Sequence, residues 1–248
     1  MATQVHVALN ARVHGAALVA GGPYGCAQGQ LETALGPCMT AQPAPPEVAT
    51  LVASARQRAA DGTIDPLATF AGDRVLVLHG KDDATVAPPL APVTAAVLRD
   101  LSGNAATVTL DVQRPFGHGW PPLDAGVACG QPGSPWLLDC DIDAAGDSMA
   151  VLFGSSPATP ASGDGTLTRF DQRELAPEGA QGLAESGFVY TPDACATGSC
   201  GALVVFHGCQ QNEENVGEAF VRDAGFNRWA DVHRVVVVYP QTQSSYMP

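Results

Sequence analysis

Residues 74–80 read Arg-Val-Leu-Val-Leu-His-Gly, an unbroken apolar run that ends in a histidine and a glycine. A run of this kind is typical of a strand buried on both faces in a parallel sheet. Comparable runs predict further strands at 16–20, 202–206 and 234–239. Each of these runs is followed by glycine, proline or histidine, which indicates that the chain leaves the sheet there.

Helical patterns alternate with these strands. The spacing of apolar residues predicts helices at 45–60, 89–101, 143–153 and 212–233. Strands are also predicted at 106–112 and 187–190, with a weaker strand pattern at 166–174, and a Ser/Pro/Gly-rich loop is expected at about 154–165. Strands that alternate with helices indicate an α/β protein with a mainly parallel sheet flanked by helices. We expect a single domain over residues 1–248.

Composition limits the function further. The chain has 248 residues, 46% of them hydrophobic, and a formal net charge of −13. A nucleic-acid partner is not expected, because binding phosphate requires a basic face. No apolar run approaches the roughly 18–20 residues of a membrane span, so a membrane partner is not expected either. The first residues, Met-Ala-Thr-Gln-Val-His, show no basic and apolar regions of an export signal.

The seven cysteines fall into three close pairs and one left over. The pairs are Cys26 with Cys38, Cys129 with Cys140, and Cys195 with Cys200, and Cys209 remains. Each pair brackets Gly, Pro or Ser, as a disulfide-closed surface loop would, and three disulfides imply an oxidising compartment. Scattered buried thiols in a cytosolic protein are the alternative. No Cys-x-x-Cys and no histidine at zinc-ligand spacing occurs, so no metal or cofactor is expected.

Three predicted strand ends carry polar residues that could do chemistry. Asp82 and Asp83 follow the strand at 74–78, His118 lies between two glycines after the strand at 106–112, and His207-Gly208-Cys209 follows the strand at 202–206. Ligands bind at the carboxyl ends of strands in such sheets. A carboxylate followed by a histidine matches the second half of a hydrolase triad, and His-Gly after a strand matches an oxyanion loop. The two aspartates could also be solvated turn residues.

The nucleophile of such a triad is absent from the pattern. No serine has glycine at both −2 and +2, as the nucleophile elbow of an α/β-hydrolase requires. Ser148 and Ser156 come nearest, but neither follows a buried strand and opens a helix. Cys209 is conceivable as a thiolate nucleophile, although it lies where the oxyanion loop is expected. His79 and His207 are expected to orient loops rather than to transfer protons.

Several motifs together resemble the secreted polyhydroxybutyrate (PHB) depolymerases and related esterases. They are Val-Phe-His-Gly-Cys-Gln-Gln at 205–211, Ala-Gly-Phe-Asn-Arg-Trp-Ala-Asp at 224–231, Val-Val-Val-Val-Tyr-Pro-Gln at 235–241, the stretch 20–27, and Asp-Ala-Thr-Val at 83–86. The order acid, histidine, oxyanion strand resembles the circularly permuted subgroup of this α/β-hydrolase family. The resemblance covers nearly the whole chain.

The resemblance implies roles for individual residues. Asp83 matches the triad acid, with Asp82 as the weaker candidate, His118 matches the general base, and the Cys209 N–H matches one oxyanion donor. Met1 to Leu9 resembles the helix that follows the nucleophile elbow, so the serine is expected a few residues upstream of Met1. A segment containing Cys-Trp-Asp-Trp, whose cysteine would pair with Cys209, is expected beyond Pro248. The chain is therefore expected to be truncated at both ends and inactive by itself.

The function expected is that of a serine-type carboxylic ester hydrolase, secreted, acting on PHB or similar short-chain hydroxyalkanoate esters. A feruloyl or acetyl esterase of the same fold is one alternative. A second is a non-catalytic protein that binds polymer surfaces through residues such as Tyr24, Trp120 and Trp136; the first two are also candidate substrate-binding residues of the esterase. Protein partners and oligomeric state cannot be read from this sequence.

Overall fold

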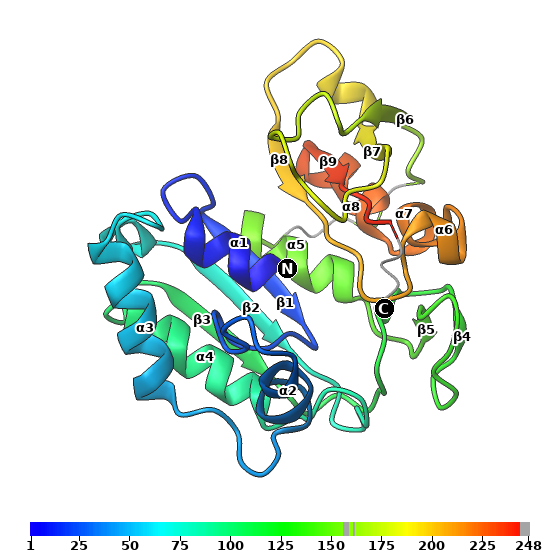
Figure 1. The fold of residues 1–248 in the computed structure, drawn as a ribbon. Coiled ribbons are helices and arrows are strands. Elements are labelled where there is room, and N and C mark those ends of the chain that lie inside the picture. Colours follow the sequence, from blue (N-terminus) through cyan, green and yellow to red (C-terminus); the bar gives the residue numbers. More distant parts are fainter. Residues whose placement is uncertain (156–158, 161, 244–248) are drawn as a thin grey trace. The chain divides into compact units, whose positions relative to one another are not determined.

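The computed structural model describes residues 1–155, 159–160 and 162–243. The chain divides into two compact units, Met1–His118 and Gly119–Pro248 (Figure 1). The expectation of a single domain over 1–248 stays a prediction. No helix in the described part of the chain is long and apolar enough to span a membrane.

The first unit is built on a three-stranded parallel sheet. Its strand order is β1-β2-β3, with Val19 opposite Leu78 and Leu78 opposite Asp111 at the carboxyl ends. Three strands and the helices around them make up the unit: α1 (Ala2–Ala8), β1 (Gly15–Val19), α2 (Leu31–Leu35), the π-helix η1 (Gly36–Thr40), α3 (Val48–Ala60), the 3₁₀ turn η2 (Leu67–Phe70), β2 (Arg74–Leu78), α4 (Leu90–Leu101) and β3 (Thr107–Asp111).

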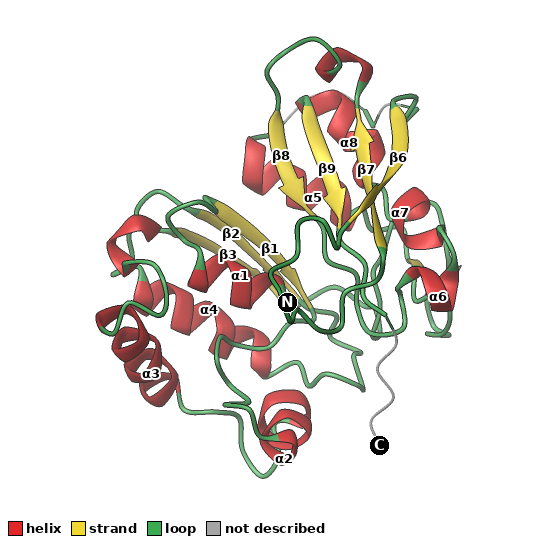
Figure 2. Cartoon of the chain, turned by 45° about the horizontal axis from the view of Figure 1, so that its top comes forward, coloured by secondary structure: helices red, strands yellow, loops and turns green. Residues whose placement is uncertain are grey.

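Burial explains why β2 is so apolar. It is the central strand, and Val75 to Leu78 are all buried. Helix α4 packs against β2 and β3, and α1 packs against β1 (Figure 2). Along α4 the buried residues repeat at helical spacing: Leu90, Ala91, Thr94, Ala95, Val97, Leu98 and Leu101. One stripe of α4 thus covers the sheet, and the parallel strands all end at one edge.

The second unit contains a four-stranded sheet of order β6-β7-β9-β8. Strands β8 and β9 are parallel, whereas β6 with β7 and β7 with β9 are antiparallel. Helix α8 packs against β9 and α5. The elements are β4 (Val127–Ala128), β5 (Leu138–Asp139), α5 (Ala144–Phe153), β6 (Thr166–Asp171), β7 (Ser186–Thr191), the 3₁₀ turn η3 (Asp193–Cys195), β8 (Gly201–Val204), α6 (Glu213–Val216), α7 (Ala219–Asp223), α8 (Phe226–His233) and β9 (Val235–Tyr239).

The predicted α/β class with mainly parallel strand pairing is confirmed, but the helix expected at 212–233 is wrong as one element. The chain breaks it into α6, α7 and α8 at Gly217 (φ 60°) and Gly225 (φ 91°). Both glycines adopt backbone angles that an α-helix cannot contain. The described residues of the predicted loop at 154–165 form neither helix nor strand, and 156–158 and 161 lie outside the described residues.

The three predicted disulfides are present. The Cα atoms are 5.9 Å apart in Cys26–Cys38, 4.8 Å in Cys129–Cys140 and 5.8 Å in Cys195–Cys200. Cys209 is exposed and forms no disulfide within the part of the chain that the structure describes. The alternative of scattered buried thiols is thereby excluded for the six paired cysteines. Each bridge closes a short loop within one unit.

Candidate active site

Asp83 lies in the loop after β2, and its side chain is buried. The residue is only 5% exposed. Its Oδ1 accepts hydrogen bonds from the Thr85 N–H at 2.9 Å and the Val86 N–H at 2.8 Å, which form a turn closed by the aspartate itself. The neighbouring Asp82 is exposed. The fold therefore gives the two aspartates opposite environments, and only Asp83 has its carboxylate fixed inside the loop.

His118 lies after β3, and its ring meets the Asp83 carboxylate. The distance from His118 Nδ1 to Asp83 Oδ2 is 2.9 Å. This contact arises because β2 and β3 are parallel neighbours, so their carboxyl ends open on the same edge of the sheet. The His118 side chain is 30% exposed. Within the described residues, nothing forms a hydrogen bond with its Nε2, which leaves that atom available to a substrate or a nucleophile.

The pKa of Asp83 determines the state of this pair. Burial by itself would raise the pKa, but hydrogen bonds from His118, His79 and the Val86 N–H outweigh burial and hold the pKa well below its usual range. Asp83 is thus a carboxylate at neutral pH and can only accept. The Nδ1 of His118 must then carry the proton, and a neutral ring has its lone pair on Nε2.

A second histidine, His79, contacts the same carboxylate from the end of β2. Its Nε2 lies 2.9 Å from the Val86 carbonyl and 3.4 Å from Asp83 Oδ2. Because the carbonyl can only accept, this Nε2 carries a hydrogen. The His79 side chain is fully buried, and its Nδ1 has no partner in the described structure. This geometry supports the expected loop-orienting role and leaves His79 no route to solvent.

The loops that hold Asp83 and His118 are bonded to each other along the backbone. Lys81 N–H donates to Arg114 O at 3.0 Å, and Asp82 N–H donates to Phe116 O at 3.3 Å. Gly80 permits this approach, since an added Cβ would lie 2.1 Å from the Phe116 carbonyl oxygen. The requirement for glycine at position 80 was missed by sequence reasoning, which saw only a glycine at a strand end.

In the second unit, the peptide that joins Gly208 to Cys209 has a fixed orientation. The Gly208 carbonyl accepts from His207 Nδ1 at 2.8 Å and from the Gln211 N–H at 3.2 Å. The His207 Nε2 accepts from the Thr242 N–H at 3.2 Å, so the ring proton is on Nδ1. Burial of the ring lowers the pKa of His207, which favours this neutral form.

The Cys209 N–H consequently points away from these contacts. A trans peptide is planar, and its N–H points opposite to its carbonyl. Nothing within the described residues accepts a hydrogen bond from the Cys209 N–H, and Cys209 is exposed. An unpaired, oriented backbone N–H is the kind of donor from which an oxyanion hole is built.

The hydroxyl of the serine candidate that the structure describes, Ser148, is already hydrogen-bonded. Ser148 lies within α5, is fully buried, and donates its hydroxyl to the Ala144 carbonyl at 2.6 Å. This is the ordinary bond of a helical serine to the preceding turn. Ser156 lies outside the described residues. Of the candidate site residues, the first unit brings together Asp83 and His118, and within the described residues no hydroxyl hydrogen-bonds to the His118 ring.

The aromatic candidates for substrate binding are largely committed to packing. Tyr24 is buried in the core of the first unit, and its hydroxyl accepts from Arg58 at 3.4 Å. Trp120 donates its indole N–H to the Ala224 carbonyl at 2.8 Å, and its ring lies 4.9 Å from that of Phe226. Trp136 is half-buried and has a left-handed backbone (φ 62°). Their role in binding stays a prediction.

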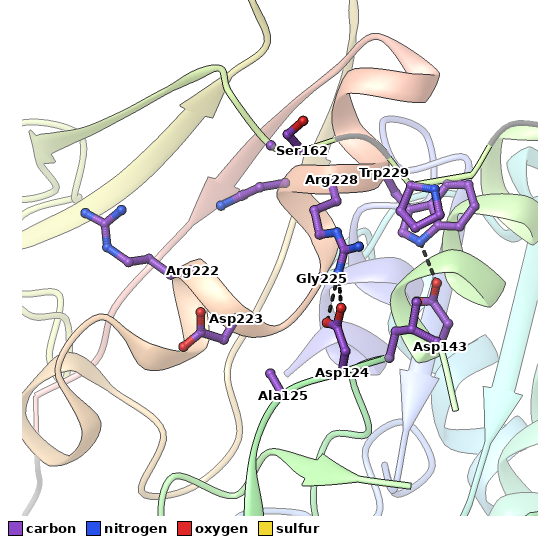
Figure 3. A pocket seen from close by; sticks show the side chains of 13 residues that line it. Asp124, Ala125, Asp143, Ser162, Arg222, Asp223, Gly225, Arg228 and Trp229 are labelled. Atoms are coloured by element: carbon purple, nitrogen blue, oxygen red, sulfur yellow. Dashed lines mark hydrogen bonds and ion pairs between the residues drawn. The ribbon is translucent and has the colours of Figure 1, made fainter. Parts of the chain in front are cut away.

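The second unit also contains a hollow of about 500 Å³, part of which is formed by α8 (Figure 3). Two pairs of polar groups along it bond to each other. Arg228 pairs with Asp124 at 2.8 Å, and the Trp229 indole N–H donates to Asp143 at 2.7 Å. Within the described residues, no cluster of His, Cys, Asp or Glu is arranged to hold a metal ion.

Two curated proteins are similar to this chain over 99% of its length. A poly(3-hydroxybutyrate) depolymerase from Delftia acidovorans is 36% identical, and this chain spans 50% of its length. A polyhydroxybutyrate depolymerase from Talaromyces funiculosus is 29% identical, and this chain spans 72% of it. The chain thus spans only about half of the first relative. No family model matches the chain.

Two solved structures are similar in fold. A serine-to-alanine variant of a PHB depolymerase, complexed with a trimer of (R)-3-hydroxybutyrate, superposes with a TM-score of 0.79 at 28% identity. A PHB depolymerase from Penicillium funiculosum superposes with a TM-score of 0.77 at 27% identity. Each match covers 93% of this chain and 72% of the other. The resemblance that the motifs indicated is confirmed in both sequence and fold.

Proposed function

Since the chain is homologous to PHB depolymerases along nearly its whole length, we propose that it carries the acid–base part of a serine-type ester hydrolase. The observation that carries this proposal is the 2.9 Å contact between Asp83 Oδ2 and His118 Nδ1, with the Nε2 of His118 free of partners within the described residues. This is the acid–histidine half of a catalytic triad.

The reaction follows from these two side chains. A serine hydroxyl attacks the ester carbonyl while the His118 Nε2 takes the hydroxyl proton. Asp83 stays ionised, holds the ring in place and stabilises the imidazolium that forms. The Cys209 N–H donates to the negatively charged oxygen of the tetrahedral intermediate. His118 then gives its proton to the leaving alcohol, and the acyl group stays on the serine. Water next gives a proton to His118 and attacks the acyl-serine, and His118 returns the proton to the serine as the acid product leaves.

The serine nucleophile is proposed to lie outside these 248 residues. No Gly-x-Ser-x-Gly occurs in the sequence, and the Ser148 hydroxyl is bonded inside α5. Removing the nucleophile from a triad typically lowers the rate by about 10⁶-fold. The 248-residue polypeptide by itself is therefore proposed to be inactive or nearly so.

The proposed substrate class is PHB and short hydroxyalkanoate esters. The names of the two curated relatives support this choice, as does the oligomer bound in the variant structure. Three disulfides further support an extracellular location, because such bridges persist in oxidising compartments. The net charge of −13 gives no support to a nucleic-acid partner.

The test compares two polypeptides. One is the 248-residue chain. The other is the same chain extended at both ends by the residues that the natural reading frame encodes before and after it, and it is called the flanked polypeptide. Hydrolysis of p-nitrophenyl butyrate and of (R)-3-hydroxybutyrate trimer is measured for both. We expect activity from the flanked polypeptide and its loss in His118→Asn, with at most trace activity from the 248 residues.

Other outcomes would change the proposal in defined ways. Robust hydrolysis by the 248-residue chain alone would overturn the proposed absence of a nucleophile. A flanked polypeptide that cleaves feruloyl or acetyl esters and not the trimer would overturn the substrate class while leaving the chemistry in place. A flanked polypeptide that binds PHB without cleaving any ester would favour a non-catalytic binding protein.

A further inference from the structure

Gln211 makes a set of contacts that neither the triad nor the packing of the core requires. The residue is only 5% exposed. Its Oε1 accepts from the Gly208 N–H at 2.9 Å, and its Nε2 donates to the carbonyls of Trp136 at 3.1 Å and Pro135 at 3.3 Å. One amide thus joins the loop that carries Cys209 to the disulfide-closed loop between Cys129 and Cys140.

The second loop is a firm anchor. The Cys129–Cys140 disulfide closes it, and the Trp136 carbonyl also accepts from the Trp120 N–H at 2.8 Å. The Leu138 N–H donates back to the Trp120 carbonyl at 2.9 Å. Trp120 itself is held by its indole bond to Ala224. Gln211 therefore ties the Cys209 loop to a segment whose own backbone is already fixed.

The Cys209 loop needs such an anchor. Gln210 has a left-handed backbone (φ 61°), which is costly for a residue with a side chain. The Cys209 N–H has no acceptor within the described residues to hold it in place. The fit at Gly208 is close, because an added Cβ would come within 2.8 Å of Gln211 Oε1. Without external contacts, a loop of this kind would relax and turn its free N–H.

We propose that Gln211 is a positioning residue that orients the Cys209 N–H. Gln211 fixes the peptide between His207 and Gly208 by accepting from the Gly208 N–H. The His207 ring fixes the next peptide, between Gly208 and Cys209, by donating to the Gly208 carbonyl. The inference rests on the proposed function, in which that N–H is an oxyanion donor. A glutamine suits this position because one amide supplies an acceptor for the Gly208 N–H and donors for two carbonyls. A glutamate would keep the acceptor but place negative charge against both carbonyls.

The first arm of the test measures geometry in the 248-residue chain, which needs no nucleophile. Amide hydrogen exchange of ¹⁵N-labelled protein is followed for Gly208 and Cys209. In the wild type we expect protection at Gly208 and almost none at Cys209. In Gln211→Ala the Gly208 amide should lose protection by about tenfold or more, since its acceptor is gone. Unchanged protection at Gly208 in this variant would overturn the proposal.

The second arm measures catalysis in the flanked polypeptide. Removal of an oxyanion donor costs about 10²–10³-fold in kcat, and a misaimed donor should cost less. We expect Gln211→Ala and Gln211→Glu to lower kcat for p-nitrophenyl butyrate by about 10–100-fold. KM should stay within about twofold, because an oxyanion donor acts mainly in the transition state. Gln210→Asn, which alters the adjacent exposed side chain and tolerates the left-handed backbone, is the matched control and should stay near wild type.

The two arms separate failure of the inference from failure of the proposed function. If the wild-type flanked polypeptide hydrolyses esters and both Gln211 variants keep kcat within twofold, the inference is wrong and the function stands. If the flanked polypeptide hydrolyses no ester, the function fails, and exchange at Gly208 alone decides whether Gln211 holds this loop. If Gln211→Ala does not fold, the isosteric Gln211→Glu decides the catalytic arm, with KM and kcat read separately.

Discussion

The Asp83–His118 pair and the Gly208–Cys209 peptide are held in place by different physics. In the first unit a buried carboxylate is surrounded by donors: two histidine rings and two backbone N–H groups. In the second unit a neutral peptide is held by a neutral imidazole and a neutral amide. The geometry of the first region depends on the negative charge of Asp83. The second region depends on the orientation of the Gly208–Cys209 peptide, which is uncharged.

The difference matches what the two proposed roles, general base and oxyanion donor, require. A base must be kept in one tautomer and must gain charge during the reaction, and an ionised partner does both. An oxyanion donor only has to point correctly, so uncharged hydrogen bonds suffice and remain largely insensitive to pH. Substitutions in the first region should therefore have large, pH-dependent effects. Those in the second should have moderate effects that vary little with pH as long as the His207 ring is neutral.

The largest effect is expected from removing the charge at Asp83. In the flanked polypeptide, Asp83→Asn should lower kcat for p-nitrophenyl butyrate by roughly 10⁴-fold, because an amide no longer selects the required tautomer of His118. The matched control is Asp82→Asn, which changes an exposed neighbour and should stay within about twofold of wild type. Equal losses in both variants would place the acid elsewhere.

The next effect concerns the close approach of the two loops in the first unit. In Gly80→Ala the new Cβ meets the Phe116 carbonyl oxygen at 2.1 Å, so the backbone must move. Overpacking of this kind typically costs about 1–3 kcal/mol in the free energy of unfolding. Denaturant unfolding of the 248-residue chain measures it. Gly130→Ala, where an added Cβ meets nothing within 4 Å, should change stability by less than about 0.5 kcal/mol.

Acid should remove the stability that the Asp83 carboxylate contributes to the first region. The pKa of Asp83 is lowered in the folded protein, so the folded state binds fewer protons at this group than the unfolded state does. Its contribution to stability is fully present above the unfolded pKa of about 3.9 and is lost as pH falls toward the folded pKa. The difference in free energy of unfolding between wild type and Asp83→Asn should therefore shrink below about pH 4. A difference that grows on acidification would show that the pKa of Asp83 is raised.

The smallest effect is expected where an ion pair faces solvent. Arg56 and Asp100 lie 2.6 Å apart, but their side chains are 59% and 47% exposed. Exposed pairs contribute roughly 0–1 kcal/mol, so Asp100→Asn should change the free energy of unfolding by less than about 1 kcal/mol. A larger loss, measured by the same denaturant titration, would mean that exposure does not decide how much an ion pair contributes in this protein.

Much of the fold could be predicted from the sequence, because its signals are local. The apolar run at 74–78 became β2, and the cysteine spacings gave all three disulfides. The helix expected at 212–233 failed because Gly217 and Gly225 outweighed an apolar periodicity that continues across them. The proximity of Asp83 and His118 followed from two neighbouring parallel strands, which the alternation of elements had indicated.

The remainder depends on contacts between distant segments. The contacts of Gln211 could not be read from the motif at 205–211 that contains it, because two of its three partners, Pro135 and Trp136, lie in a distant segment. Gly80 looks like an ordinary glycine until Phe116 packs against it. Sequence reasoning could place Trp120 near a candidate site but could not foresee that its indole N–H would bond to Ala224.

The most direct test is the tautomer of His118 in the 248-residue chain, read from two-bond ¹H–¹⁵N correlations at a pH where the ring is neutral. If Asp83 and His118 act as an acid–base pair, the wild-type His118 ring carries its proton on Nδ1 and a lone pair on Nε2. Such a pair also predicts that this preference is lost in Asp83→Asn and kept in Asp82→Asn. A wild-type ring protonated on Nε2, or a tautomer unaffected by Asp83→Asn, would contradict it.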